Sequence, residues 1–457
     1  MRFCIVTLGC KVNQYESQAM SAILLSRGHT QVQHGESCDV CIVNTCAVTA
    51  ESARKSRQAV RSVIRVEKSS NTKPLIAVCG CFSELEPVSA AMLGADIVSG
   101  SGNRREFALK VERLFAERNA AAATTTAIAT TKPAELTTTN DIAVVRAFEE
   151  LAPGSSADRT RAYLKIQDGC DNYCAYCVIP YARGRARSLP LARCAEYARR
   201  LDEQGFREIV VTGIEISSYG KDFSDGTSAC SNYSNRKTLA DAVEAISESA
   251  ANTRVRLGSL DPGSVTEVFI ERISALSGLC GHFHLSLQSG CNDTLRRMGR
   301  KYGTEVVERA IASLRRRFPD CGITADLITG FPGETDAEFS QTMDFIKSCG
   351  FSSMHIFPFS PRRGTRADAM PDQVEKQVRH ERARIASALA KEMAEAFRHS
   401  QIGKVLSVLF EREQDGVCIG RSDNYLKTAV KEGGDRNSIR PVLISACDNG
   451  ILRGEII

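Results

Sequence analysis

The sequence predicts three successive domains: a small α/β layer, an incomplete β/α barrel and a short β-barrel. Strand and helix patterns alternate at the start of the chain, and they alternate six more times between residues 161 and 398. The residues after that show only short β patterns with polar turns. The length of 457 residues agrees with about three domains of ~150 residues each.

The composition is that of a soluble globular protein, with 43% hydrophobic and 25% charged residues and a net charge of +5. No apolar run approaches the ~18 residues that span a bilayer, and the N-terminus lacks the pattern of a secretory signal. We therefore expect a cytoplasmic protein without a membrane partner. Cysteines are abundant, at 18, and in a reducing compartment clustered cysteines indicate metal or redox chemistry rather than disulfides.

Residues 1–118 form the first predicted domain. Short β-branched runs predict buried strands, and the stretches between them have helical periodicity, which favours a parallel sheet. The predicted strands are Phe3–Leu8, Cys41–Asn44 and Leu75–Cys79, and the predicted helices are Gln14–Arg27 and Glu51–Glu67. Residues 119–159 begin with NAAAATTTAIATTKPAELTTTN, a composition that cannot bury a core, and we expect a flexible linker there.

Residues 160–398 form the predicted barrel. Six β/α units fit an incomplete barrel better than a closed one of eight units, and active-site residues in such folds lie at the carboxyl ends of the strands. The predicted strands are Ala162–Gln167, Glu208–Thr212, Arg254–Ser259, His282–Gln288, Gly322–Thr329 and Phe351–Phe357. Residues 399–457 contain four short predicted strands and are expected to form a small β-barrel.

The segment GCDNYCAYCVIP follows the first barrel strand and carries Cys170, Cys174 and Cys177 with C-x3-C-x2-C spacing. Three adjacent thiolates can bind a four-iron cluster and leave one iron open for a ligand that is not protein. A zinc ion would need a fourth Cys or His nearby, and the next one is Cys194, inside a predicted helix.

This motif resembles that of the radical S-adenosylmethionine (SAM) superfamily. The resemblance implies that SAM binds the open iron and that one-electron reduction yields a 5′-deoxyadenosyl radical. Tyr176 stands at the aromatic position of the motif and is expected near the adenine.

A second set of cysteines follows the strand ends of the first domain: Cys10 in TLGCKVNQYES, Cys46 in NTCAV and Cys81 in GCF. Parallel neighbours bring such positions together at one edge of a sheet. These segments resemble those of the methylthiotransferase family, whose members combine this domain with a radical SAM barrel and a C-terminal RNA-binding TRAM module. Gly403-Lys404 and GRSDNY, at residues 420–425, resemble that module.

The resemblance implies two [4Fe–4S] clusters and two SAM molecules per turnover. The barrel cluster generates the radical, and the auxiliary cluster, held by Cys10, Cys46 and Cys81, carries the sulfur. Family substrates are threonylcarbamoyladenosine in tRNA, isopentenyladenosine in tRNA, and a ribosomal-protein aspartate. The segment LQSGC, ending at Cys291, most resembles the first branch in its bacterial form, which methylthiolates C2 of N6-threonylcarbamoyladenosine at position 37.

Further residues are expected to contact SAM because they end barrel strands or match superfamily positions. Glu215 suits a cationic amine, and Gly213 permits close backbone approach. The other expected SAM contacts are Ser259, Gln288 and Gly330, the last in ITGFPGET.

Two arginine runs are expected to meet RNA phosphates, and such contacts position an RNA without reading its bases. They comprise Arg183, Arg185 and Arg187, and Arg296 and Arg297. The expected partners are a tRNA anticodon stem-loop and an electron donor such as flavodoxin or ferredoxin. Two rival hypotheses remain at this point: an electron carrier with two clusters, and an RNA-binding scaffold whose cysteines hold structural zinc.

Overall fold

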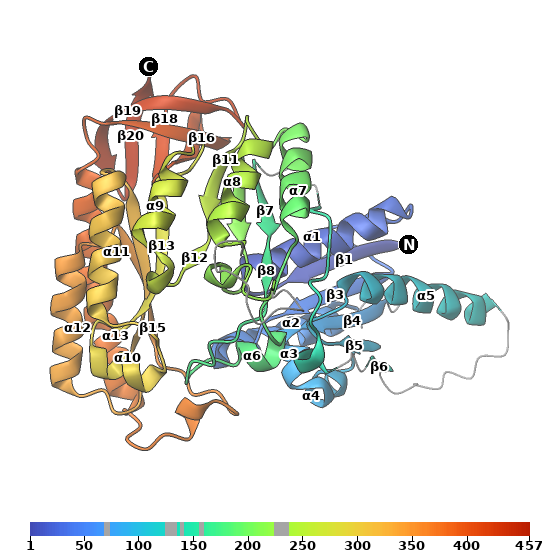
Figure 1. Ribbon diagram of the computed structural model, residues 1–457. Coiled ribbons are helices and arrows are strands. Elements are labelled where there is room, and N and C mark those ends of the chain that lie inside the picture. Colours follow the sequence, from blue (N-terminus) through green and yellow to red (C-terminus); the bar gives the residue numbers. More distant parts are fainter. Residues whose placement is uncertain (68–73, 124–134, 138–140, 155–159, 224–236) are drawn as a thin grey trace, which may run out of the picture. The chain divides into compact units, whose positions relative to one another are not determined.

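The computed structural model describes residues 1–67, 74–123, 135–137, 141–154, 160–223 and 237–457 (Figure 1). The chain forms two compact units. Unit 1 contains Met1–Ser156, Asp168–Tyr173 and Cys177–Leu189, and unit 2 contains Ala157–Gln167, Cys174–Tyr176 and Pro190–Ile457. Within the described residues, no helix combines the length and apolarity needed to cross a membrane.

Unit 1 is built on a parallel sheet of six strands in the order β2-β1-β3-β4-β5-β6. The three predicted strands are present as its centre, and β2, β5 and β6 are additional. The strands are β1 (Arg2–Thr7), β2 (Thr30–Gln31), β3 (Val40–Thr45), β4 (Leu75–Gly80), β5 (Ile97–Ser99) and β6 (Glu135–Thr137). The helices are α1 (Lys11–Ser26), α2 (Ala50–Glu67), α3 (Cys81–Leu85), α4 (Pro87–Met92), α5 (Arg104–Ala123) and α6 (Ile179–Arg183).

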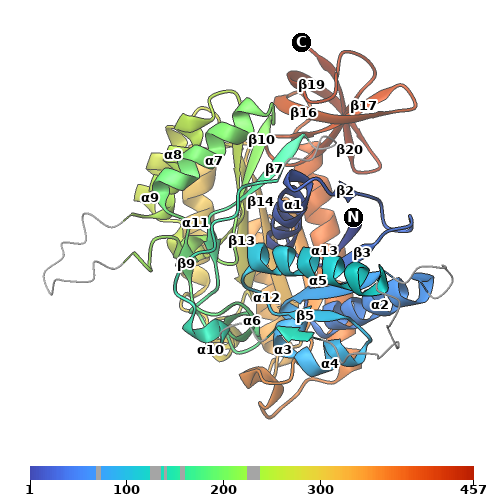
Figure 2. The same cartoon turned by 90° about the vertical axis from the view of Figure 1, so that its right-hand side faces the viewer.

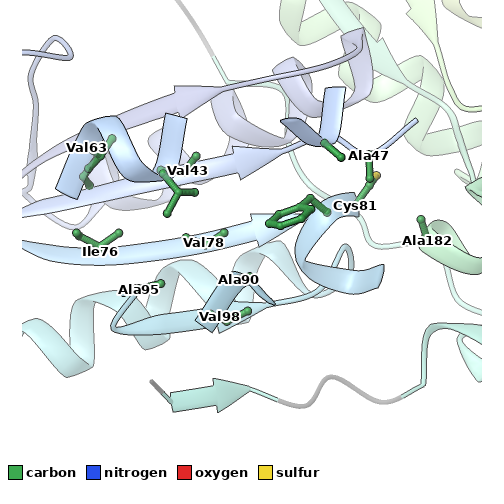
Figure 3. Close-up of a cluster of buried hydrophobic side chains, with 14 of the residues drawn as sticks. Val43, Ala47, Val63, Ile76, Val78, Cys81, Ala90, Ala95, Val98 and Ala182 are labelled. Carbon is green, nitrogen blue, oxygen red and sulfur yellow. The ribbon is translucent and has the colours of Figure 1, made fainter. Parts of the chain in front are cut away.

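Strands β3 and β4 are buried along their whole length, so their side chains alternate between two apolar layers. One layer contains Val43, Ile76, Val78 and Phe82, and Figure 3 shows it around the central strands, with Cys81 at the strand end. Ala182, from α6, belongs to the same core. The segment after Cys177 therefore packs into unit 1 rather than into the predicted barrel.

The Ala/Thr-rich segment differs from the expected linker. Alanine is the strongest helix former, and residues 119–123 continue α5. Glu135–Thr137 pairs in parallel with β5. Farther on, Ile142 and Leu151 are buried in unit 1, and the Tyr15 hydroxyl donates a hydrogen bond to the Leu151 carbonyl. The rest of the expected linker, 124–134, 138–140 and 155–159, lies outside the described residues.

Unit 2 contains the predicted incomplete barrel, whose strands are parallel and follow chain order. Figure 1 shows helices flanking them. The strands are β7 (Arg161–Lys165), β10 (Glu208–Thr212), β11 (Arg254–Leu257), β12 (Ser259–Leu260), β13 (His282–Gln288), β14 (Gly322–Thr329) and β15 (Ser353–Pro358). The helices are α7 (Leu191–Glu203), α8 (Leu239–Ser249), α9 (Glu267–Ser274), α10 (Asn292–Met298), α11 (Thr304–Arg317), α12 (Asp336–Cys349) and α13 (Lys376–His399). Two short strands, β8 (Gln167–Asp168) and β9 (Arg187–Ser188), lie outside these sheets.

A closed barrel of five strands follows α13, in the order β16-β17-β18-β20-β19. Figure 2 shows several of these strands next to the C-terminus. The predicted small β-barrel is thus confirmed, with one strand more than expected. Its strands are β16 (Val405–Gln414), β17 (Val417–Ser422), β18 (Lys427–Val430), β19 (Ile439–Asp448) and β20 (Ile451–Ile456).

Buried charges join this β-barrel to the strands of unit 2. Glu208 is fully buried and pairs with both Arg254 and Arg256, at 2.7 and 2.8 Å. The two guanidinium groups also donate to four carbonyl oxygens of the β-barrel, those of Ser407, Arg421, Ser422 and Asp423. A carboxylate on β10 thereby orients two arginines of β11 toward the β-barrel backbone.

Candidate functional site

Cys10, Cys46 and Cys81 follow the carboxyl ends of β1, β3 and β4, which are adjacent strands of the unit 1 sheet. Cys10 precedes α1, and Cys81 is the first residue of α3. Burial raises the pKa of the Cys81 thiol to about 11, and the neighbouring Arg183 cation opposes this. Cys46 and Cys10 also act electrostatically on Cys81. The structure therefore brings together the three thiols that the sequence placed at separate strand ends.

Two glycines make this convergence sterically feasible. Gly9 has φ +103°, and a Cβ added to it would lie 2.8 Å from the Cys46 Cβ. Gly80 has φ +110°, and its added Cβ would lie 2.3 Å from the Thr45 carbonyl oxygen. Both distances are too short for any other residue, so glycine lets the strand ends approach one another.

Among the buried charged side chains around these thiols, arginines outnumber carboxylates. Arg104, Arg183 and Arg187 are buried together with two buried carboxylates, Glu16 and Asp168. Arg104 Nη2 and Arg187 Nη1 are buried without a hydrogen-bond partner. Because buried charges require compensation, the residues fit an anionic group such as a thiolate-bound iron–sulfur cluster.

Among the described residues, no group of three or more His, Cys, Asp or Glu side chains could hold a metal ion. A four-iron cluster binds its thiolates at separate iron corners and so needs them farther apart than a single ion does.

Each sulfur of Cys170, Cys174 and Cys177 lies near an N–H donor, two from the backbone that follows them and one from a distant arginine. The backbone N–H groups of Asn172 and Ile179 point to Cys170 and Cys177, both at 3.5 Å. Arg300 Nη1 lies 3.2 Å from the Cys174 sulfur. Since such bonds stabilise thiolates, each of the three sulfurs is suited to act as an anionic ligand.

Glu215 lies just after β10 and is the most perturbed carboxyl group of the predicted SAM site. Its backbone N–H donates to Gln167 Oε1 at 2.8 Å. Burial, and after it the nearby Asp261 carboxylate, raise the pKa of Glu215 to about 7, although Arg300 acts in the opposite direction. Gly213 is also required here, because an added Cβ would lie 2.9 Å from the Gln167 carbonyl oxygen.

Asp261 and Arg300 were not predicted to lie near Glu215, yet both act on its carboxyl group. Arg300 pairs with Asp261 at 3.0 Å and reaches Cys174, so it connects the cysteine loop to the surroundings of Glu215. Asp261 directly follows β12, a strand-end position that could have identified it. Arg300 belongs to a basic run and gave no signal of its burial, which leaves its side chain 6% exposed.

The other predicted SAM residues lie at or near strand ends of unit 2, except Tyr176. Tyr176 packs edge-on against Phe331, with ring centroids 6.5 Å apart. Gln288 ends β13 with φ +68°, and Ser259 is exposed at the start of β12. The space beside Gly330 is occupied by Arg379, whose Cγ would lie 2.2 Å from an added Cβ. SAM contact by these residues stays a prediction.

The structure contradicts RNA contact for Arg183 and Arg187. Their side chains are 1% and 5% exposed and are directed to the buried carboxylates, so a phosphate cannot reach them. Arg185 and Arg296 are exposed, each with a surface carboxylate partner. Arg297 is one-third exposed and forms two bonds to Glu338.

Comparison with known proteins identifies the family. Residues 164–346 match the Radical SAM superfamily, and residues 2–100 match the uncharacterized protein family UPF0004. The chain is 35% identical over 434 residues to the threonylcarbamoyladenosine tRNA methylthiotransferase MtaB of Bacillus subtilis (strain 168), covering 93% of this chain and 89% of the relative. It is 36% identical over 425 residues to the protein of the same name from Thermotoga maritima, covering 93% and 90%.

The chain belongs to the radical SAM methylthiotransferase family. This methylthiotransferase is 29% identical over 427 residues to a tRNA-2-methylthio-N(6)-dimethylallyladenosine synthase of Acetivibrio thermocellus, covering 92% and 83%. Its fold is similar to that of the radical SAM methyltransferase TsrM from Kitasatospora setae, whose structure contains cobalamin and a [4Fe-4S] cluster. The TM-score is 0.55 at 15% identity, covering 92% of this chain and 76% of that one. Family membership implies that this methylthiotransferase uses SAM and a [4Fe–4S] cluster.

Proposed function

We propose that this enzyme methylthiolates C2 of N6-threonylcarbamoyladenosine at position 37 of tRNA, with the anticodon stem-loop as its partner. The observation that carries the proposal is the pair of three-cysteine sets in a chain with 35 and 36% identity to relatives named for that nucleoside. Identity to the dimethylallyladenosine synthase is lower, at 29%. The LQSGC segment favours the same branch.

In this proposal Cys170, Cys174 and Cys177 hold one [4Fe–4S] cluster, and Cys10, Cys46 and Cys81 hold the auxiliary one. With SAM bound, the two clusters supply radical hydrogen abstraction and the sulfur, and two SAM molecules are used per turnover. A radical route is needed because no side-chain base removes an aromatic C–H proton at neutral pH. Arg300 orients Cys174 through its N–H bond to the sulfur.

Glu215 binds the ammonium group of SAM by a charge-assisted bond, and Gly213 lets the cosubstrate approach the backbone. Burial favours the protonated form of Glu215, and a bound cation would shift it to the carboxylate. The further SAM contacts proposed are those of Tyr176, Ser259, Gln288 and Gly330.

Exposed arginines position the RNA through its phosphates. Arg185 and Arg296 can bind a phosphate in place of their surface carboxylate partners. Arg297 must first break its ion pair with Glu338. The proposal places the enzyme in the cytoplasm with a flavodoxin or ferredoxin as reductant.

The test is expression of this chain in a bacterial strain that makes threonylcarbamoyladenosine and isopentenyladenosine but lacks methylthiotransferases, followed by mass spectrometry of tRNA nucleosides. We expect 2-methylthio-threonylcarbamoyladenosine to appear and its precursor to decrease. Cys174→Ala is the control and should leave both nucleosides unchanged.

Appearance of 2-methylthio-isopentenyladenosine instead would assign the chain to the second tRNA branch. If neither nucleoside forms with an enzyme that cleaves SAM on reduction, the tRNA substrate is wrong. Methylthiolation of a ribosomal-protein aspartate would then be sought by peptide mass spectrometry. Absence of SAM cleavage would favour the electron-carrier hypothesis.

A further inference from the structure

Arg183 is a buried cation in direct contact with Cys81. It ends α6, within unit 1, and its side chain is 1% exposed. Its Nε donates to the Cys81 sulfur at 3.3 Å, and Nη2 donates to Asn13 Oδ1 at 2.6 Å. The remaining N–H groups are directed to Glu16 and Asp168. All five donors of the guanidinium fork therefore have partners, which fixes the position of Nε against the sulfur.

The same network also holds Cys10. The Cys10 sulfur lies 3.8 Å from Asn13 Oδ1, the oxygen that accepts from Arg183. Asn13 Nδ2 donates to the carbonyl oxygens of Leu8 and Thr45, at the ends of the two strands that lead to Cys10 and Cys46. Arg183 is thus connected to all three strand ends that carry the predicted ligands.

The charge balance indicates what this arrangement favours. The buried set of Arg104, Arg183, Arg187, Glu16 and Asp168 has one positive charge in excess. A four-iron core of charge two plus, bound by three thiolates, carries one negative charge, and reduction adds a second. A nearby cation and an N–H bond to a ligand sulfur both stabilise the more negative state, because hydrogen bonds to the sulfurs and local charge set cluster potentials.

We infer that Arg183 is a positioning residue of the auxiliary cluster, which orients Cys81 and raises the reduction potential of the cluster that Cys81 helps to hold. This inference rests on the proposed function, in which Cys10, Cys46 and Cys81 bind iron and sulfide.

The experiment isolates the auxiliary cluster in the full chain by replacing Cys170, Cys174 and Cys177 with alanine. The cluster is reconstituted anaerobically, and its midpoint potential is measured by a redox titration followed by electron paramagnetic resonance. In this background, Arg183→Met should lower the equilibrium constant for one-electron reduction about tenfold, which corresponds to 59 mV more negative. Arg183→Lys retains the charge and should recover part of the change.

Two further variants separate electrostatics from folding. Glu16→Gln removes a buried negative charge and should move the potential in the positive direction. Arg54→Met is the matched control, because Arg54 is an exposed arginine of the same unit, paired with Glu51, and the potential should not change. If Arg183→Met fails to retain iron, the midpoint potentials of Arg183→Lys and Glu16→Gln are used to test the inference.

A potential that is the same in the Arg183, Glu16 and Arg54 variants, with iron content intact, overturns the inference and leaves the proposed function standing. A parent chain that binds no iron and sulfide through Cys10, Cys46 and Cys81 overturns the second cluster itself. These two failures are distinguished before any variant of Arg183 is made, because iron and acid-labile sulfide are measured first in the parent.

Discussion

At the scale of single residues, glycines allow the strand ends that carry the predicted cysteines to approach one another. The placement of Cys10, Cys46 and Cys81 at strand ends was predictable from the sequence, since each follows a buried β-branched run. The burial of Arg183 and Arg187 was not, because an alternating run of arginines is more often an exposed face. Glu16, the carboxylate that pairs with Arg183, is 167 residues distant in the chain, and no local pattern indicates such a pairing.

The first prediction concerns Glu215 and pH. Its pKa is raised to about 7, so the carboxylate that we propose to pair with the SAM ammonium group is lost as pH falls below 7. We expect the Kd for SAM to rise as pH falls from 8 to 6 and to depend much less on pH in Glu215→Gln. That variant should bind about tenfold more weakly at pH 8, because it lacks a charge-assisted hydrogen bond. Anaerobic calorimetry measures both.

The control for this prediction is Glu203→Gln, which changes an exposed carboxylate of unit 2. Its SAM affinity should follow that of the parent at every pH. An affinity in Glu215→Gln with the same pH profile as the parent would remove Glu215 from the SAM site. The sign for folding stability is separate: the folded state holds this proton more tightly, so Glu215 stabilises the fold at low pH and loses that contribution as pH rises through 7.

At the scale of secondary-structure elements, long buried strands were predicted better than short strands. The boundaries of β10, β13 and β14 were predicted correctly, because each is a buried run between clear helical patterns. The strands β5, β6 and β20 were not predicted. The first two have three residues each, and a run that short gives no periodicity. They form because β4 offers an open edge to β5, and β5 in turn offers one to β6.

The second prediction concerns the junction between β10 and β11. Glu208 compensates Arg254 and Arg256, and their guanidinium groups hold the pKa of that carboxyl well below its usual range despite burial. Glu208→Ala should cost about 3–5 kcal/mol of stability, because it leaves buried guanidinium groups unpaired. Denaturation followed by circular dichroism should show a lower midpoint for unit 2.

The exposed pair of Glu203 and Arg199, 3.9 Å apart, supplies the matched control, and Glu203→Ala should shift the midpoint little. Since the pKa of Glu208 is depressed, the junction contributes its stability above the unfolded pKa of this carboxyl and loses it as pH falls through the lower folded value. A Glu208→Ala midpoint equal to that of Glu203→Ala would show that the arginines are satisfied by the β-barrel carbonyls alone.

At the scale of the whole molecule, the sequence patterns predicted three kinds of fold along the chain. They did not predict the residues at which each fold begins and ends. The Ala/Thr composition correctly marked a break in pattern, yet residues 141–154 fold into unit 1 through Ile142 and Leu151. Two separate buried side chains are too weak a signal to outweigh composition. The packing of α6 within unit 1 likewise depends on contacts between residues far apart in the sequence. One is the hydrogen bond from the Ser101 hydroxyl to the Ala182 carbonyl.

The third prediction concerns iron. The reconstituted chain should bind about eight iron atoms and as many sulfides, because each cubane contains four. Replacing Cys10, Cys46 and Cys81 with alanine should remove about half, as should replacing Cys170, Cys174 and Cys177. Colorimetric iron and sulfide assays on anaerobically purified protein give the counts.

Cys447→Ser serves as the control, since Cys447 is a half-buried thiol of the C-terminal β-barrel, and it should retain the full amount of iron. If iron is lost only when Cys170, Cys174 and Cys177 are replaced, the enzyme has one cluster rather than two. Zinc without sulfide in the parent would restore the scaffold hypothesis.

The path of the chain through unit 1 has a consequence for modularity. The unit is completed by Cys177–Leu189, a segment that the chain reaches only after it has begun the barrel. A fragment cut at residue 156 would keep Glu16 and Cys81 but lack Arg183, and one of the two guanidinium groups on that carboxylate would be missing. The first 156 residues are therefore not an autonomous module that recombination could transplant whole: any functional exchange must also carry the arginine that arrives later in the chain.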